Sequence, residues 1–244
     1  MPDNLVTAPH VTLEYKTRHS LFRHSYRKAL DDITFDVCRG ETLGIVGGNG
    51  SGKSTLLRVL AGIFRPNAGR VTCHCESIML LSLALGFEGE LSGRDNALLS
   101  GVLLGGSRRL VEDKLDEIIA FAELEDQIND PLKTYSSGMR ARLGFAVALM
   151  MRADLLLIDE VLSVGDIEFR RKAEKAMHDR LASDQTVVLV SHSPDQVKKL
   201  CDRVLWLNGG RSEMLGDAAE VVDAYVSSGQ HAPKARPAKA VRSQ

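Results

Sequence analysis

The sequence predicts an α/β fold in which helices cover both faces of a mostly parallel sheet and a helical lobe is inserted between its strands. Three observations carry this prediction. Short apolar runs typical of buried strands alternate with helical stretches of about 10–15 residues. Residues 94–151 are helical in pattern throughout, which is typical of a separate lobe. A Gly-rich turn at residues 47–52 joins one predicted strand to the helix that follows it.

The expected elements follow in chain order. Strands are expected at residues 10–15, 33–37, 42–46, 70–73, 77–81, 155–158, 186–190 and 203–207. Helices are expected at residues 54–61, 111–122, 139–151, 169–181, 194–201 and 218–226. Residues 16–28 carry five Lys or Arg and no acid, and we interpret them either as a solvated loop or as a contact for phosphate or lipid headgroups.

Length and composition favour one globular domain at residues 1–228. The 244 residues are 44% hydrophobic and 26% charged, which are ordinary globular values. The tail at residues 229–244 is rich in Ala and Pro, with four basic and no acidic residues, so we expect it to be disordered. A net charge of -1 argues against nucleic acid as a partner.

Neither a membrane span nor a secretory signal is expected. No segment approaches the ~20 apolar residues that cross a bilayer. Residues 1–10 lack a basic start followed by an apolar run. The cysteines are too few and too scattered for a disulfide framework, so a reducing cytosol is expected; they are Cys38, Cys73, Cys75 and Cys201.

A phosphate-binding loop lies between the third expected strand and the first helix. It matches G-x-x-x-x-G-K-[ST] and consists of Gly47, Gly48, Asn49, Gly50, Ser51, Gly52, Lys53, Ser54 and Thr55. Its backbone N–H groups and the helix N-terminus favour anions. We expect Lys53 to reach the β- and γ-phosphates of ATP and the Ser54 hydroxyl to bind Mg²⁺. The alternative is a purely structural Gly-rich turn.

Two acids end a buried strand near residue 158. Asp159 follows four apolar residues, and the carboxyl ends of strands are where open α/β sheets bind ligands. We expect Asp159 to hold Mg²⁺ directly or through water, and Glu160 to polarise the attacking water as general base. The alternative is that both acids simply meet solvent at the strand end.

Three further motifs carry a family resemblance. Residues 135–139 read Tyr-Ser-Ser-Gly-Met, residues 163–166 read Ser-Val-Gly-Asp, and residues 187–193 read Val-Val-Leu-Val-Ser-His-Ser. They resemble the signature motif, the D-loop and the switch-histidine element of ABC transporter ATPases. The first departs from the usual Leu-Ser-Gly-Gly-Gln at three of five positions. This variant resembles the ATPases that export O-antigen, teichoic acid and capsular polysaccharides, over residues 11–226.

The resemblance implies an ABC nucleotide-binding domain with an antiparallel β subdomain, working as a homodimer. ATP would lie between the Gly-rich loop of one subunit and Ser136, Ser137 and Gly138 of the other, with Asp166 in the D-loop and His192 donating to the γ-phosphate. It implies a peripheral protein on the cytoplasmic face of the bacterial inner membrane. Two copies would serve two copies of an ABC-2 type permease that exports a lipid-linked polysaccharide.

Several assignments near this site stay open. Most ABC ATPases carry a Gln between core and lobe, and none occurs between Gly47 and Asp126; residues 85–96 resemble the exporter stretch that replaces it. Glu88 there either faces the permease or is solvated. Tyr15 or Tyr26 stacks on adenine, with Tyr15 preferred because it ends a strand. His192 is placed at the rim by Ser193 as N-cap, Pro194 at the first helical position and Gln196 completing a capping box.

Rival functions make different demands on the sequence. An ABC exporter of drugs or other lipids would carry the usual signature and the missing Gln. A DNA-associated ABC ATPase would insert long heptad arms between Ser54 and Ser136, and the interval is too short for them. A metal site at Cys73-His74-Cys75 lacks a second ligand pair, so these residues are interpreted as strand filler.

Overall fold

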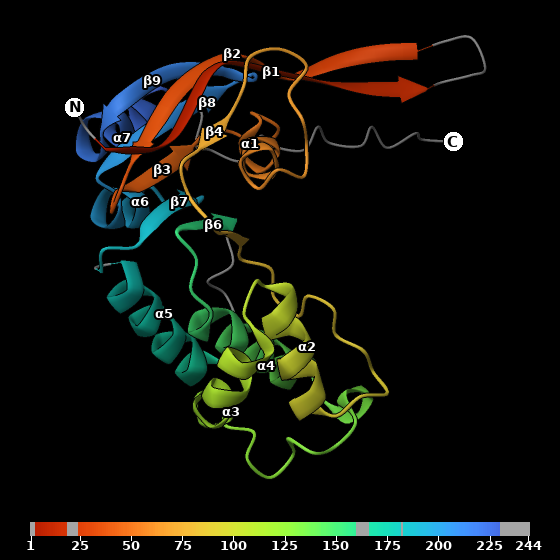
Figure 1. Cartoon of the computed structure of the whole chain (residues 1–244). Helices are drawn as coiled ribbons and strands as arrows, with labels where there is room; N and C mark the ends of the chain where they lie inside the picture. The colour runs from red at the N-terminus through yellow and green to blue at the C-terminus, as the bar shows by residue number, and fades with distance from the viewer. Residues whose placement is uncertain (1–2, 19–23, 160–165, 182, 230–244) are drawn as a thin grey trace, which may run out of the picture.

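The computed structural model describes residues 3–18, 24–159, 166–181 and 183–229 (Figure 1). Over these residues no helix is both long enough and apolar enough to span a membrane. The expected tail begins after α7 (Ala218–Ser227) and, apart from Gly229, lies outside the described residues. The division into residues 1–228 and 229–244 therefore stays a prediction.

The main sheet has six strands and is mostly parallel, as predicted. Its order is β5 (Ile78–Leu80), β6 (Leu155–Asp159), β7 (Thr186–Val190), β3 (Thr42–Val46), β8 (Arg203–Asn208) and β9 (Arg211–Asp217). Neighbours pair in parallel except β8 and β9, which are antiparallel. Every residue of β3 and β7 is buried, which explains why both are continuous apolar runs.

Strand β9 was not predicted from the sequence. Its seven residues, Arg-Ser-Glu-Met-Leu-Gly-Asp, are exposed or half-buried and show no alternation of apolar and polar side chains. The strand forms because Gly209 and Gly210, both at positive φ, turn the chain back so that β9 pairs with β8 at the sheet edge.

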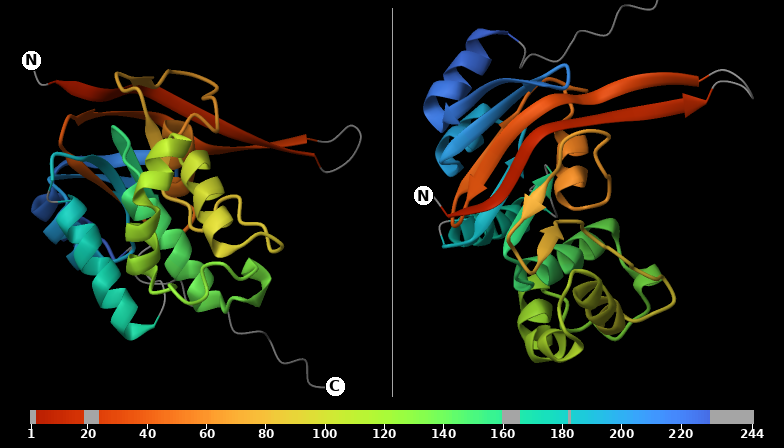
Figure 2. Two further views of the ribbon diagram at one scale, coloured as in Figure 1. Left: turned by 60° about the horizontal axis from the view of Figure 1, so that its bottom comes forward. Right: turned by 45° about the horizontal axis from the view of Figure 1, so that its top comes forward.

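The second sheet is the antiparallel subdomain expected from the resemblance. Its order is β2 (His24–Cys38), β1 (Asn4–Arg18) and β4 (Thr72–Cys73). The interpretation of residues 16–28 as a loop is wrong for residues 16–18 and 24–28, because both strands continue through them; residues 19–23 lie outside the described part. The distal end of the hairpin projects beyond the core (Figures 1 and 2). Its described side chains at residues 14–16 and 25–28 are exposed or half-buried, so backbone pairing rather than an apolar face maintains this end.

The inserted lobe is helical, as predicted. It contains α2 (Gly93–Leu103), α3 (Arg108–Ala122), a 3₁₀ turn at Leu132–Thr134 and α4 (Ser137–Met150). The remaining helices are α1 (Lys53–Leu60), α5 (Ile167–Leu181), α6 (Pro194–Leu200) and α7. The lobe lies to one side of the main sheet, with α5 running alongside it (Figure 1).

The main sheet separates two hydrophobic clusters. On β6, Leu155 and Leu157 belong to the cluster beneath the β subdomain and α1, whereas Leu156 and Ile158 belong to the cluster that continues into the helical lobe. Successive side chains of a strand point to opposite faces, so one apolar strand contributes to both clusters. The site described below is therefore carried by strands that are buried on both faces.

Cys73 and Cys75 differ from the sequence interpretation. The two residues are joined by a disulfide, although the scattered cysteines predicted no disulfide framework. Strand β4 ends at Cys73, so the strand alternation that would point His74 and Cys75 to opposite faces does not continue past it. Both cysteines pack against the cluster beneath the β subdomain. Among the described residues no group of three or more His, Cys, Asp or Glu side chains is placed to hold a metal.

Arg180 of α5 attaches the helical lobe to the core. Its guanidinium donates to the backbone carbonyls of Ala148 (3.0 Å) and Leu149 (2.9 Å), and to that of Met151 (2.6 Å), at the C-terminus of α4. Burial, together with the positive charge of Arg152, lowers the pKa of Arg180 to about 10. The side chain thus satisfies carbonyls that a helix end leaves without partners and places a cation at the negative end of the helix dipole.

We expect Arg180→Met to lower the free energy of unfolding by about 2–4 kcal/mol, because several carbonyls lose a charged donor that water cannot fully replace. Urea denaturation followed by circular dichroism measures the change. Arg171→Met, which removes an exposed arginine of the same helix, is the matched control and should change stability by less than about 0.5 kcal/mol. Equal effects of the two variants would contradict this role for Arg180.

Candidate functional site

The predicted site residues of the core converge at one edge of the main sheet. The Gly-rich loop follows β3, Asp159 is the last residue of β6, and His192 comes two residues after β7 ends. Strand β7 lies between β6 and β3, and all three are parallel, so their carboxyl ends lie side by side. Residues distant in sequence therefore surround one pocket.

The loop conformation requires glycine at two positions. Gly47 (φ 151°) and Gly52 (φ 109°) adopt backbone conformations that side chains disfavour. A Cβ on Gly52 would lie 2.6 Å from the Ala29 carbonyl oxygen, and one on Gly47 would overlap the Leu207 carbonyl. Close packing of the loop against β2 and β8 thus explains both glycines.

The pocket has a volume of about 300 Å³ and combines the predicted loop with residues of β1, β2, β6 and β7 and with His192. Its lining consists of Tyr15, Arg27, Ala29, Asn49, Gly50, Ser51, Gly52, Lys53, Ser54, Thr55, Asp159, Val190 and His192. Gly47 and Gly48 contribute backbone rather than lining surface: their carbonyls accept from Nζ of Lys53 at 2.7 and 3.0 Å. Lys53 is buried, so its ammonium is held inside the loop.

Ser51, Ser54 and Asp159 carry side-chain oxygens that fit a nucleotide bound with a divalent cation. The Ser51 hydroxyl is buried and has no hydrogen-bond partner among the described residues, which suits a phosphate oxygen as its missing partner. The Ser54 hydroxyl and the Asp159 carboxylate line the same pocket. Magnesium prefers such oxygen ligands, with phosphate and water completing its shell. The donor set therefore fits Mg²⁺ bound together with a nucleotide.

The two tyrosines considered for adenine stacking point to opposite faces of the hairpin. Tyr15 pairs with Arg27 across the strands, and both line the pocket. Tyr26 pairs with Lys16, is 63% exposed and does not line the pocket. The Tyr15 hydroxyl lies 3.0 Å from Oγ1 of Thr55. Of the two tyrosines, Tyr15 is therefore the one placed to meet a ligand in this pocket.

Of the described residues, Ser136, Ser137, Gly138 and Asp166 do not line the pocket within one chain. Ser136, which precedes Ser137 and Gly138, is exposed and caps α4 by accepting from the N–H of Met139 at 3.1 Å. Asp166 caps the start of α5: the N–H groups of Phe169 and Glu168 donate to its carboxylate and hold its pKa below the usual range.

Glu160 and residues 163–165 lie outside the described residues. The roles of Glu160 as general base and of residues 163–165 in a D-loop therefore rest on the sequence. Strand β6 is described as far as Asp159, the residue immediately before Glu160, and Asp159 lines the pocket. Glu160 thus directly follows, along the chain, a residue that lines the pocket.

The turn that presents His192 differs from its prediction in one detail. Ser193 is the N-cap of α6 and Pro194 occupies the first turn, as expected. Gln196, however, does not complete a capping box: its Oε1 lies 3.3 Å from Oγ of Ser191, and that same hydroxyl accepts from the N–H of Ser193. The N–H of Ser193, which Gln196 would accept in a capping box, thus donates to Ser191 instead.

The stretch that replaces the missing Gln is organised by Asn96, which is fully buried in α2. Its Nδ2 donates to the carbonyls of Glu88, Leu91 and Ser92, and its Oδ1 accepts from the N–H of Glu88 at 2.7 Å. The Glu88 residue is exposed and does not line the pocket. Asn96 was given no role from the sequence, although it ends the stretch of residues 85–96 that carries part of the resemblance. Arg27 was not singled out, because it lay in the basic segment at residues 16–28, for which a solvated loop and a phosphate contact were both left open.

The chain is similar to known ATP-binding proteins over most of its length. The ABC transporter family matches residues 30–163. An O-antigen export system ATP-binding protein, RfbB of Klebsiella pneumoniae, is 38% identical over 238 residues, which cover 91% of this chain and 97% of that protein. The teichoic acids export ATP-binding protein TagH of Listeria innocua is 43% identical over 197 residues, which cover 81% of this chain and 58% of that protein.

Solved structures share the fold. A dimeric structure of the ATP-binding cassette MJ0796 with ADP and phosphate has a TM-score of 0.70 at 22% identity, covering 87% of this chain and 98% of that one. An ATP-binding subunit of an ABC transporter has a TM-score of 0.72 at 20% identity. Together with the loop, the converging strand ends and the family match, these findings show that the chain belongs to the ABC transporter family, as an ATP-binding and ATP-hydrolysing subunit related to the O-antigen and teichoic acid export ATPases.

Proposed function

We propose that this chain powers export of a lipid-linked polysaccharide, of O-antigen, capsule or teichoic-acid type, through a separate ABC-2 type permease. The observation that carries the proposal is the Tyr-Ser-Ser-Gly-Met signature at residues 135–139, in a chain 38% identical to an O-antigen export ATP-binding protein over 97% of that protein. The chain works as a homodimer with two permease subunits, peripherally on the cytoplasmic face of the inner membrane.

In the proposed site, each nucleotide is held between two copies of the chain. Lys53 and the loop N–H groups bind the phosphates, and Ser54 and Asp159 hold Mg²⁺. Tyr15 stacks on adenine. The exposed N-terminus of α4, with Ser136, Ser137 and Gly138, covers the same nucleotide from the partner subunit, and Asp166 lies in the adjoining D-loop.

Hydrolysis then releases the two copies. Glu160 polarises the attacking water, and His192 donates to the γ-phosphate. Because ATP contacts both subunits, it stabilises the closed dimer relative to the open one, and its loss reverses that preference. ATP has a higher affinity for the closed dimer than for the open one. The free energy that corresponds to this difference is available to move cargo in the permease.

Deletion of the gene in its host tests the proposal. We expect surface polysaccharide to disappear and lipid-linked glycan to accumulate inside the cell. The wild-type gene should restore export, whereas Lys53→Ala should not, because the phosphates lose the cation held inside the loop. Extracted glycolipids and surface glycan are measured separately. Unchanged surface glycan, with accumulation of another lipid or sensitivity to a drug, would instead indicate an exporter for that compound; DNA-repair defects would indicate a non-transport ATPase.

A further inference from the structure

A second cation faces the nucleotide pocket from the β1–β2 hairpin. Arg27 lies on the hairpin face that carries Tyr15, and both side chains line the pocket. Beneath them, β2 runs along the Gly-rich loop. Ala29 lies over Gly52, and a Cβ on Gly50 would lie 3.6 Å from Nη2 of Arg27. Arg27 and Ala29, two residues apart on β2, therefore lie against Gly50 and Gly52, two residues apart in the loop. Of the two β2 residues, Arg27 is the one nearer the projecting end of the hairpin.

The Arg27 guanidinium makes no hydrogen bond or ion pair within the described part of the chain. Its sequence neighbour behaves differently, since Nζ of Lys28 donates to Asp31 at 2.9 Å. A guanidinium that lines a polar pocket without a carboxylate partner favours an anion there, because its fork of donors matches phosphate oxygens. Arg27 is therefore available to a ligand of the pocket.

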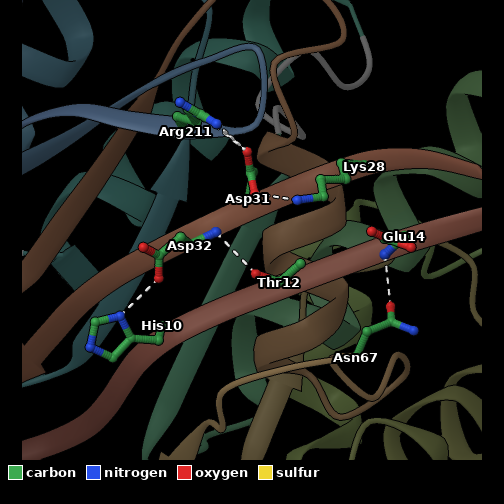
Figure 3. Close-up of polar contacts among 8 residues, drawn as sticks. All are labelled: His10, Thr12, Glu14, Lys28, Asp31, Asp32, Asn67 and Arg211. Atoms are coloured by element: carbon green, nitrogen blue, oxygen red, sulfur yellow. Dashed lines mark hydrogen bonds and ion pairs between the residues drawn. The ribbon is translucent and has the colours of Figure 1, made fainter.

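Polar contacts fix the position of the hairpin (Figure 3). Asp31 of β2 binds both Lys28 and Arg211, and Nη2 of Arg211 on β9 lies 2.7 Å from its carboxylate. On the other strand, the N–H of Glu14 donates to Asn67 in the loop after α1 at 2.7 Å. Both strands are thus attached to the core near the level of Arg27, so the backbone that carries Arg27 has a defined position over the loop.

We propose that Arg27 binds the phosphate chain of the nucleotide from the hairpin side, at the part that ADP and ATP share. Arg27 lies beside Tyr15, whereas Asp159 and His192 approach from the ends of β6 and β7. The terminal phosphate belongs on the side of Asp159 and His192, where hydrolysis is proposed, so the hairpin side receives the inner phosphates. The inference rests on the nucleotide function proposed for this pocket.

The test is the affinity of the full chain for MgADP and for MgATP, measured by calorimetry at constant ionic strength. Arg27→Ala should weaken both by about tenfold to hundredfold, as expected for loss of a charged hydrogen bond. Arg27→Lys should lose less nucleotide affinity than Arg27→Ala, and Arg27→Glu should lose more. The matched control is Lys16→Ala, which removes the same charge from the opposite hairpin face and should change affinity by less than about twofold.

Three results would overturn the inference: unchanged affinity of Arg27→Ala, an equal loss in Lys16→Ala, or a loss for ATP with none for ADP. The melting temperature of each variant without nucleotide should match wild type, since Arg27 has no polar partner among the described residues. Failure of the wild-type chain to bind nucleotide would contradict the proposed function itself. Normal wild-type binding together with an unaffected Arg27→Ala would contradict only the role of Arg27.

Discussion

Replacement of Ser136 by arginine is expected to abolish ATP hydrolysis while leaving nucleotide binding to the single chain nearly unchanged. Ser136 is exposed at the N-terminus of α4 and does not line its own chain's pocket. If a second copy supplies that helix end to the nucleotide, a bulky cation there blocks closure of the two copies. Calorimetry measures binding, and phosphate release measures turnover.

The loss of a helix cap must be separated from the loss of the dimer contact. Ser136 accepts a hydrogen bond from the N–H of Met139, and removal of such a cap costs about 1 kcal/mol of stability. Ser107→Arg is the matched control, because Ser107 caps α3 of the same lobe through the N–H of Leu110. That variant should hydrolyse ATP at the wild-type rate. Wild-type turnover by Ser136→Arg would rule out a site completed by the partner's signature helix.

Glu160→Gln is expected to retain ATP binding and to lower turnover by about 10²–10⁴-fold, the usual contribution of a general base. The Gly-rich loop and Asp159, which line the pocket, are untouched by this change. ATP should therefore stay bound, and the protein should accumulate as a closed dimer on size-exclusion chromatography. Single-turnover measurements separate the chemical step from product release.

Glu168→Gln makes the same acid-to-amide change at an exposed position in the first turn of α5 and should leave turnover unaffected. A Glu160→Gln protein that hydrolyses ATP within about threefold of wild type would exclude Glu160 as the base. Loss of ATP binding in the same variant would point instead to a role in holding the nucleotide or its metal ion.

The fold class and the phosphate loop could be predicted from sequence because both depend on neighbouring residues. The loop is contiguous, and its glycines, Lys53 and Ser54 are ordered by local backbone geometry. The buried strands β3, β6 and β7 are apolar runs whose composition alone indicates burial. The N-cap Ser193 was likewise recognisable, because a cap bonds to N–H groups two or three residues away.

The long hairpin, β9 and the position of Arg27 beside the pocket could not be predicted in this way. A charged ribbon such as residues 24–28 has no apolar periodicity, and its pairing with residues 14–18 depends on hydrogen bonds between distant segments. The choice of Tyr15 over Tyr26 as the residue lining the pocket depends on the register of that pairing. A shift by one residue would exchange the two faces.

The sequence by itself determined which residues can bind phosphate and that the strands are buried. Tertiary structure alone decided which of them meet. Asp159, His192 and the Gly-rich loop lie together because β7 lies between β6 and β3, and Arg180 meets the end of α4 because α5 packs beside the lobe. Periodicity indicates how much of a segment is buried, whereas strand order and register arise from the packing of side chains far apart in the chain.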